Sequence, residues 1–517
     1  MYFSKTTTFA WGSFLQIFGG QTYSFSDYSQ ALQTGILQLT DTKLQGLQTA
    51  LTAGSYFGLP AGLVYDRVKH WPRAGPRGII AIGCIFNFVG YFCFWSVATG
   101  RFTGIPYWMI CAFAFVAGSG TTWLDTTVMA TNVGNLKEES GIVIGALKSF
   151  VGLGAGMSTQ FFKAYFTDRP LSFLLMQGIA PTLVATVTGI FTNIVPYVET
   201  SQSYARRACK VAVMTGLVIV VLIFMSTFIK TLNKGEGKII WVWLILGTFV
   251  PLLASPLYTG GIRSIRVGSD EDEEDDLLQR LTDPTDQNKG GEASEEDGLT
   301  FGETLRRLDF WLLWFVFGNI CGCGLTLLHN LGQIVPAFTD GKKTECTIYV
   351  QLFSLMNCCG RLGAGYLSQH MLSKYRVPRT LFLMVPGLML GFDFILLNFI
   401  SFDKLYIPVL IGGLAFGTVW SLIPSILCDR PFFGTKAFAS NYNMTTLSSV
   451  FGDFLLSTQL SGRFYDYQRK KQHHASAECY GRVCFRQTFM VVSGIAFLSC
   501  FAALALFLRS RKKYKQM

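Results

Sequence analysis

Two residues of opposite charge stand inside long apolar stretches of this sequence. Asp125 lies in PYWMICAFAFVAGSGTTWLDTTVMA, and Lys148 lies in GIVIGALKSFVGLGAGMSTQFF. Each stretch is long enough to cross a bilayer, where a charge is costly unless it faces a cavity or a partner. Two readings stay open. The pair is either a structural ion pair, or Asp125 takes up a proton and frees Lys148 to bind an anionic solute.

The expected helix bounds place the two charges at similar depth. With spans at about 106–129 and 141–162, Asp125 lies about four residues and Lys148 about seven residues from the cytoplasmic helix ends. At 1.5 Å per residue these depths are roughly 6 and 10 Å, a difference that a lysine side chain bridges. We therefore expect the two side chains to meet.

Other polar and aromatic residues inside spans are further candidates for solute binding or coupling. Asp453 follows Gly452 in a span rich in small residues, which favours a position beside a cavity over that of a second intramembrane acid, Asp393. His329 ends a span, where it is either a solvated helix end or a proton relay. Three more candidates are Trp123 and Trp420, which either line the cavity or pack in the core, and Asn443, whose glycosylation sequon is silent inside a span.

Composition defines the class of protein. Half of the 517 residues are hydrophobic and 15% are charged, and apolar runs recur from end to end. About fourteen runs are long enough to cross a membrane, which predicts an all-helical, multi-pass protein in the lipid bilayer. The net charge of +11 indicates basic cytoplasmic loops. The sequence has no basic patch with interleaved aromatic residues, so it does not indicate a nucleic-acid partner. Its Cys and His residues do not have the spacing of metal ligands, so we expect no metal cofactor.

Basic loops set the expected orientation, with both termini in the cytoplasm. The acidic segment between residues 259 and 305 is also cytoplasmic in this scheme, and its composition is typical of disorder. Within it, Glu273, Leu277 and Leu278 resemble a dileucine sorting signal for adaptor proteins, although acidic linkers often match by chance. A second basic loop, RFYDYQRKKQHHASAECYGRVCFRQ, falls on the opposite side. It is either an exoplasmic cap, in which Cys479 and Cys484 can form a disulfide, or a sign of a miscounted span.

The two halves of the chain carry matching segments. Gly120-Thr-Thr-Trp123 matches Gly417-Thr-Val-Trp420, and Gly58-Leu-Pro-Ala-Gly62 matches Arg361-Leu-Gly-Ala-Gly365, each about 300 residues apart and in the same order. Such a repeat predicts two six-helix bundles with a solute site between them at the membrane midplane.

These segments resemble the plant nodulin-like membrane proteins, a branch of the major facilitator superfamily. The resemblance runs along nearly the whole chain and includes TYSFSDYSQAL, GALKSFVGLGAG, DFWLLWFVFGNICGCGLTLLHNLGQI and YGRVCF. The second half is also similar to the monocarboxylate and oxalate/formate carriers. The superfamily resemblance implies secondary active transport, whereas the nodulin-like branch implies little about the solute. Asp125 stands where the plant proteins usually have Asn, which puts a shared solute in doubt.

The same resemblance implies roles for two further groups. Gly58, Gly62, Asp66 and Arg67 resemble the superfamily's gating loop, in which Asp66 accepts hydrogen bonds from a neighbouring helix N-terminus and locks the outward-open state. An ordinary basic loop is the alternative reading. Gln369 stands at the matching place in the second half, so we expect an asymmetric gate.

Arg361 aligns with an intramembrane arginine of monocarboxylate carriers, but Asn357 replaces the acid four residues before it. Arg361 either binds a carboxylate or snorkels to the membrane surface.

The predicted architecture is a first bundle at 1–196, two linking helices at 197–258, an acidic loop at 259–305 and a second bundle at 306–517. The predicted function is secondary active transport of a small polar or anionic solute by alternating access, with protons as a candidate coupling ion. The competing prediction is a receptor or scaffold that signals through the acidic loop. The sequence does not distinguish a plasma membrane from a vacuolar or endosomal one.

Overall fold

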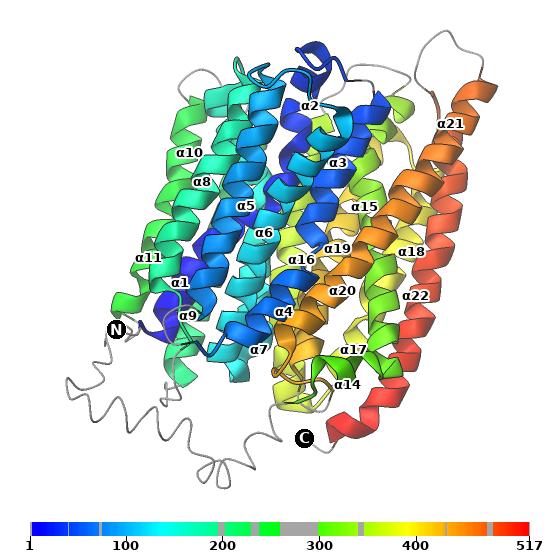
Figure 1. The fold of residues 1–517 in the computed structure, drawn as a ribbon. Coiled ribbons are helices and arrows are strands. Elements are labelled where there is room, and N and C mark those ends of the chain that lie inside the picture. The colour runs from blue at the N-terminus through cyan, green and yellow to red at the C-terminus, as the bar shows by residue number, and fades with distance from the viewer. Residues whose placement is uncertain are drawn as a thin grey trace, which may run out of the picture.

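The computed structural model describes residues 3–39, 41–71, 75–194, 202–228, 237–258, 298–339, 346–429, 432–472 and 479–515. Within these ranges the chain is helical almost throughout (Figure 1). Its first and last described residues lie at the same end of the helices, which we call the terminal end. The proposed sorting residues Glu273, Leu277 and Leu278 fall outside the described ranges.

The first bundle contains six crossing segments, several of them built from consecutive helices. They are α1 (Lys5–Leu15), η1 (Gln16–Ser24) and α2 (Phe25–Thr34); α3 (Asp41–Tyr56) and α4 (Leu59–Val68); α5 (Gly75–Ala98); α6 (Tyr107–Asn135); η2 (Lys137–Glu139), α7 (Ser140–Phe161) and η3 (Phe162–Phe166); and α8 (Pro170–Phe191).

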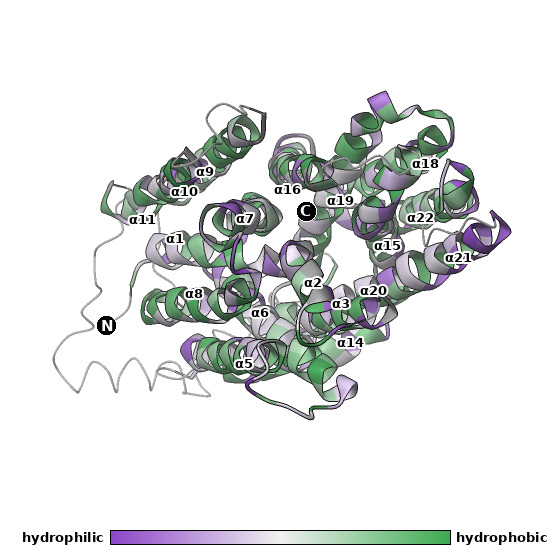
Figure 2. Cartoon of the chain, turned by 90° about the horizontal axis from the view of Figure 1, so that it is seen from above, coloured by the Kyte–Doolittle hydropathy of each residue, from purple (hydrophilic) through white to green (hydrophobic). Residues whose placement is uncertain are grey.

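The linking helices come next and pack mainly on the first bundle. They are α9 (Gln202–Phe228), α10 (Gly237–Gly247) and α11 (Phe249–Tyr258). α9 lies against α7 and also reaches α16, and α11 lies against α1 (Figure 2).

The second bundle repeats the pattern of the first. Its elements are α14 (Phe301–Leu305); α15 (Leu308–Phe338); α16 (Cys346–Tyr375); α17 (Arg379–Phe382) and α18 (Met384–Phe399); η6 (Phe402–Lys404) and α19 (Tyr406–Cys428); α20 (Phe438–Gly452), η7 (Asp453–Ser461) and α21 (Gly462–Lys471); and α22 (Val483–Lys515).

Ten helices of the described residues are long and apolar enough to span a membrane. Four more stretches, α1–α2, α3–α4, α16 and α20–α21, are equally long but more polar. Together they follow the order of the fourteen predicted spans. Three of these more polar stretches, α3–α4, α16 and α20–α21, make contacts between the bundles, where polar side chains face protein instead of lipid. The chain is an integral, multi-pass membrane protein.

The interface between the bundles is made by α4 against α20 and α7 against α16. Glycine makes both contacts close. A Cβ atom at Gly62 of α4 would lie 2.5 Å from the Ala439 carbonyl oxygen, and one at Gly145 of α7 would lie 3.1 Å from the Cα of Gly365. Such small residues let helix backbones approach each other inside a membrane. The predicted glycine motif therefore lies at the closest approach of the two halves.

Two segments run longer than their apolar stretches. The sequence ends the fourth span near residue 129, but α6 continues to Asn135 because its last polar side chains find partners inside the bundle. The Tyr65 and Thr131 hydroxyls lie 2.8 Å apart, and Asn135 donates to the Asn193 carbonyl at 3.0 Å. The first segment likewise runs past the predicted residue 25 to Thr34.

Candidate solute site between the bundles

A small cavity lies where the two bundles meet. Residues of both halves line it: Gly19, Thr22, Tyr23, Ser55, Tyr56, Thr121, Thr122, Asp125, Lys148 and Val151 from the first, and Arg361, Trp420, Tyr442, Asn443 and Thr446 from the second. About 30 Å³ is open to the centres of water molecules. At roughly 10–15 Å³ for one water, that is room for two or three. The state described here is nearly closed and has no room for a sugar ring.

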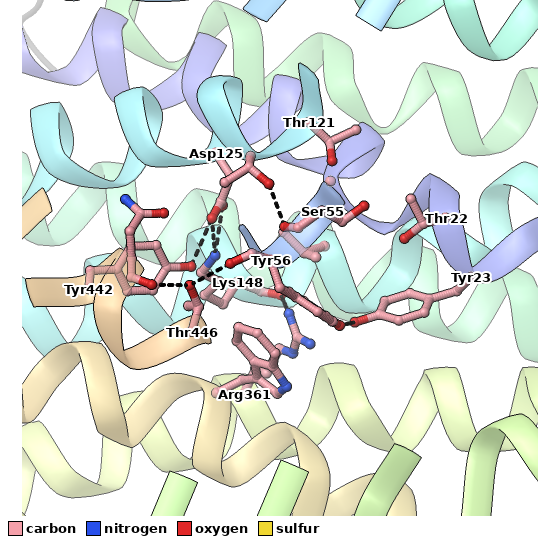
Figure 3. A pocket seen from close by; sticks show the side chains of 15 residues that line it. Thr22, Tyr23, Ser55, Tyr56, Thr121, Asp125, Lys148, Arg361, Tyr442 and Thr446 are labelled. Carbon is pink, nitrogen blue, oxygen red and sulfur yellow. Dashed lines mark hydrogen bonds and ion pairs between the residues drawn. The ribbon is translucent and has the colours of Figure 1, made fainter. Parts of the chain in front are cut away.

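Asp125 and Lys148 form the predicted pair on one wall of this cavity (Figure 3). The Lys148 ammonium donates to both carboxylate oxygens of Asp125, at 2.6 and 2.7 Å. Tyr442 of the second bundle donates its hydroxyl to the same carboxylate at 2.8 Å. The Lys148 ammonium also lies 4.9 Å from the centre of the Tyr442 ring. The ion pair is therefore a contact between bundles as well as within one.

The depth predicted for Asp125 was too small, whereas the depth predicted for Lys148 and the match between the two hold. Asp125 lies ten residues before the end of α6 at Asn135, and Lys148 lies eight residues after the start of α7 at Ser140. These offsets correspond to roughly 15 and 12 Å. Both charges therefore lie near the middle of the helices, at the level of a midplane site.

Arg361 is a buried cavity residue and does not snorkel. It is 1% exposed. Its Nε donates to Asn357 Oδ1 at 2.9 Å, and its Nη1 donates to the backbone carbonyl of Lys148 at 2.8 Å. Among the described residues its Nη2 has no hydrogen-bond partner, and the Tyr23 side chain interacts electrostatically with the guanidinium. Asn357 thus orients the guanidinium, whose remaining donor group is available to an anionic group in the cavity.

The charged residues lining the cavity are one acid and two bases, so its formal net charge is +1. Lys148 is balanced by Asp125, which leaves Arg361 as the excess positive charge. Burial makes this imbalance costly. A bound monoanion would cancel it.

Aromatic rings form the other walls. Trp420 stacks on Tyr56 at 5.5 Å and lies 5.5 Å from the Arg361 guanidinium. The Tyr23 and Tyr56 hydroxyls lie 2.7 Å apart. Trp123, the repeat equivalent of Trp420, does not line the cavity and packs edge-on against Phe86 at 5.7 Å. The structure therefore brings only one of the two matching tryptophans to the site.

Asn443 joins the bundles on the terminal side of the cavity. It donates to the Thr126 hydroxyl at 2.9 Å. A Cβ atom at Gly58 would lie 1.8 Å from its side-chain oxygen, so the break between α3 and α4 at Gly58 leaves the space that Asn443 fills.

Asp66 closes the terminal end of the interface. Its carboxylate accepts from the Ser440 backbone N–H at 2.8 Å and from the Ser440 hydroxyl at 2.6 Å, at the N-terminus of α20. The partial positive charge of a helix N-terminus favours a carboxylate there. Arg67, next to it, is exposed. We call the Asp66–Ser440 contact the first latch.

Gln369 of the second bundle makes the matching contact with a helix N-terminus of the first bundle. Its side-chain oxygen accepts from the Gly141 backbone N–H, at the N-terminus of α7, at 3.2 Å. Arg379 donates to the same oxygen and is paired with Asp429 at 3.2 Å. We call the Gln369–Gly141 contact the second latch. The predicted asymmetry lies in the chemistry of the acceptor, since both halves cap a helix of the other.

His329 and Asp453 form a second buried pair, on the side of the cavity away from the terminal end. His329 Nδ1 lies 3.1 Å from Asp453 Oδ1. The reading of His329 as a solvated helix end was wrong, because α15 continues for nine more residues to Phe338. Asp393 is buried elsewhere in the second bundle, with both oxygens unpartnered among the described residues.

Cys479 and Cys484 are joined by a disulfide at the end of the molecule opposite the termini. The Cys479 backbone N–H donates to the Tyr465 hydroxyl at 3.1 Å, which ties the disulfide to α21. Residues 473–478 of this predicted cap lie outside the described part of the chain.

Sequence reasoning missed two residues that the structure brings forward. Tyr442 reaches Asp125 from 317 positions away, and only the fold shows that contact. Asp27 follows the predicted end of the first span, yet α2 carries it into the bundle, where it accepts from Thr159 at 2.9 Å. The sequence signal for Asp27 is an acid two residues beyond an apolar run, with no Gly or Pro between them.

The two helical bundles around a central cavity define a membrane protein of the major facilitator fold. Solved structures agree on the fold. A major facilitator proton:xylose symporter, XylE, is 11% identical, with a TM-score of 0.53 over 96% of this chain and 94% of its own. A bacterial homologue of the human drug peptide transporters PepT1 and PepT2 is 10% identical, with a TM-score of 0.52 over 98% of this chain and 100% of its own.

The family follows from the sequence. Residues 7–259 match the Nodulin-like family model, and residues 294–516 match the model of the NFD4 C-terminal domain. Protein NUCLEAR FUSION DEFECTIVE 4 of Arabidopsis thaliana is 23% identical over 99% of this chain and 90% of its own length. The chain is a nodulin-like membrane protein with the major facilitator fold.

Proposed function

We propose that this protein is a secondary active transporter of a small monoanion. The observation that carries the proposal is the formal charge of +1 in a buried cavity between two bundles, where Arg361 Nη2 has no hydrogen-bond partner among the described residues. A carboxylate placed beside this nitrogen would cancel the charge and gain a charge-assisted hydrogen bond. The solved structures of the same fold belong to transporters.

Alternating access explains how the solute would cross. The two latches and the close glycine contacts hold the bundles together on the terminal side of the cavity. When these contacts separate and the opposite side closes, the same cavity faces the other compartment. The basic loops favour a cytoplasmic terminal end, so we assign the described state to one closed towards the cytoplasm.

Asp125 holds Lys148 in place in this scheme. Removing either partner would leave an unpaired buried charge, which costs on the order of 3–5 kcal/mol. The Tyr442 hydroxyl binds the same carboxylate from the other bundle, so opening of the interface changes the surroundings of the pair. The pair therefore stabilises the cavity wall, and its surroundings differ between the open and the closed interface.

Uptake of 14C-labelled pyruvate into proteoliposomes tests the proposal, because pyruvate is a small monoanion at neutral pH. The wild type should take it up and Arg361→Gln should reduce initial uptake by about tenfold to a hundredfold, the equivalent of a charged hydrogen bond. Gel filtration of each variant reports folding. Equal uptake by wild type and Arg361→Gln would refute the role of Arg361, and no uptake by any protein would refute pyruvate as a solute.

Arg509→Gln is the matched control. Arg509 is also an arginine of the second bundle, but it pairs with Asp309 outside the cavity at 2.6 Å, and Lys513 remains on the same carboxylate at 3.0 Å. This variant should transport at the wild-type rate.

A further inference from the structure

His329 and Asp453, which we call the His–Asp pair, lie beyond the cavity on the side away from the termini. The helix that begins at the first latch carries Asn443 and Thr446 along the cavity wall and reaches Asp453 seven residues after Thr446. That distance is roughly 10 Å along the helix. The side chain of His329 is 18% exposed and that of Asp453 is 9% exposed. The pair is therefore close to the solute site but not part of it.

The local backbone fixes this pair. Asp453 is the first residue of η7, a π-helical segment that interrupts the α20–α21 helix. Segments of this kind are frequent at functional sites because they redirect side chains from the α-helical positions. Asn330, next to His329, donates to the Ser457 hydroxyl of η7 at 3.4 Å. Two side chains of α15 thus hold η7 in register.

Tyr56 lies at the solute site and is near enough to Asp453 to interact with it electrostatically. It belongs to the first bundle, lines the cavity and stacks on Trp420. Asp453 interacts electrostatically with His329 and Cys321 of α15 and, across the bundles, with Tyr56 of α3. Because Tyr56 and Asp453 lie in different bundles, a rocking motion changes their separation. The charge state of the pair is therefore coupled to the state of the interface.

Protonation of the His–Asp pair and protonation of Asp125 would affect different interactions. Both oxygens of Asp125 bind Lys148, and one also binds Tyr442, so a proton there disrupts the ion pair that supports the cavity. In the His–Asp pair, Nδ1 is bonded to Asp453, and no described residue bonds the second ring nitrogen, Nε2. A proton can add to the ring while the carboxylate stabilises the imidazolium.

We propose that the His–Asp pair is the coupling-proton site, distinct from the solute site, of a transporter that moves one proton with each monoanion. The inference rests on the proposed function. The imidazole lone pair accepts a proton from water on the side away from the termini, and no other bond changes. After the bundles rock, the same N–H bond breaks and the proton returns to water on the terminal side. Solute and proton together carry no net charge.

The test separates coupling from transport. Proteoliposomes containing Asp453→Asn should exchange internal pyruvate for external 14C-labelled pyruvate within about threefold of the wild-type rate, because the cavity is intact. Accumulation driven by an inward proton gradient should fall at least about tenfold, to the level set by exchange alone. Accumulation equal to that of the wild type would overturn the proposal, and so would an equal loss of exchange and accumulation.

Asp393→Asn is the matched control for this variant. Asp393 is a buried acid of the same bundle that does not line the cavity. Its substitution should leave both exchange and gradient-driven accumulation unchanged. A selective loss of accumulation in Asp393→Asn, with Asp453→Asn normal, would move the proton site to Asp393 and overturn the proposal.

A second measurement decides the matter even if pyruvate is not the solute. The chain has five histidines, so 15N-histidine labelling and the His329→Gln variant identify the His329 signal. His329 should change its protonation state as the pH is varied over the range in which the protein stays folded, and Asp453→Asn should change the midpoint. A His329 signal that stays in one state over this range, or is unaffected by Asp453→Asn, would overturn the proposal independently of transport.

Discussion

The two latches at the terminal end close the same interface with different chemistry. In the first, a carboxylate accepts two hydrogen bonds from Ser440 at the N-terminus of α20. In the second, the neutral Gln369 amide accepts one from the Gly141 N–H at the N-terminus of α7. The repeat has kept the geometry, a side-chain acceptor on a helix N-terminus of the other half, while the charge of the acceptor has changed.

This difference predicts an unequal share of the closing energy. A carboxylate on a helix N-terminus gains from the helix dipole as well as from charge-assisted hydrogen bonds. Gln369 gains one neutral hydrogen bond, and it depends on Arg379 and Asp429 for its orientation. The first latch should therefore contribute most of the stability of the closed terminal end, and the second should adjust it.

Loss of the first latch should have the largest effect. Asp66→Ala removes two hydrogen bonds to a carboxylate, so the closed terminal end should lose about 2–3 kcal/mol, and the open-to-closed ratio should rise roughly thirtyfold to 150-fold. Spin labels at exposed positions 137 and 374, one in each half, report the separation by double electron–electron resonance. An unchanged distance distribution would show that the glycine contacts alone close this end.

Loss of the second latch should have a smaller effect in the same direction. Gln369→Ala removes the neutral hydrogen bond across the interface, together with the Arg379 hydrogen bond within the second half, which does not join the bundles. We expect a shift of about 1 kcal/mol, or roughly fivefold, by the same spin-label distances. A shift larger than that of Asp66→Ala would reverse the ranking of the two latches. Arg509→Gln, which touches neither latch, serves as the control.

A charge added to the second latch should give the smallest effect, and in the opposite direction. Gln369→Glu places a carboxylate at the α7 N-terminus beside Arg379, which should favour the closed state by about 0.5–1 kcal/mol. The open population in the Asp66→Ala background makes such a gain measurable. If Asp66→Ala/Gln369→Glu opens as widely as Asp66→Ala, acceptor charge is not what separates the latches.

Much of the fold follows from the sequence because membrane burial imposes long apolar runs. The apolar runs did not predict how far from the helix ends the polar residues lie. α6 extends past its apolar end because Thr131 and Asn135 find partners at Tyr65 and at the Asn193 carbonyl, and α15 encloses His329 because that side chain pairs with Asp453. A polar residue satisfied between helices looks like a loop residue when only hydropathy is considered.

The candidate site was partly accessible to the same reasoning. Asp125, Lys148 and Arg361 stand out as charges in apolar surroundings, and the repeat places Trp420 and Gln369 opposite their counterparts. Tyr442 could not be found this way, because its contact with Asp125 depends on how the two bundles dock. A charged residue inside an apolar stretch can therefore be recognised in the sequence as a candidate site residue. Its contacts with residues of the other bundle are known only from the tertiary structure.

The most direct test of the cavity's net charge of +1 is the solute preference of Asp125→Asn. This substitution removes the only acid lining the cavity and makes its formal charge +2, so a dianion should gain relative to a monoanion. Competition of malonate and of unlabelled pyruvate against 14C-labelled pyruvate uptake, at neutral pH, gives the preference. The account predicts that malonate improves relative to pyruvate by at least about tenfold over wild type, on the order of one charged interaction. An unchanged ratio, in a variant that still transports, would contradict the assignment of this cavity as the anion site.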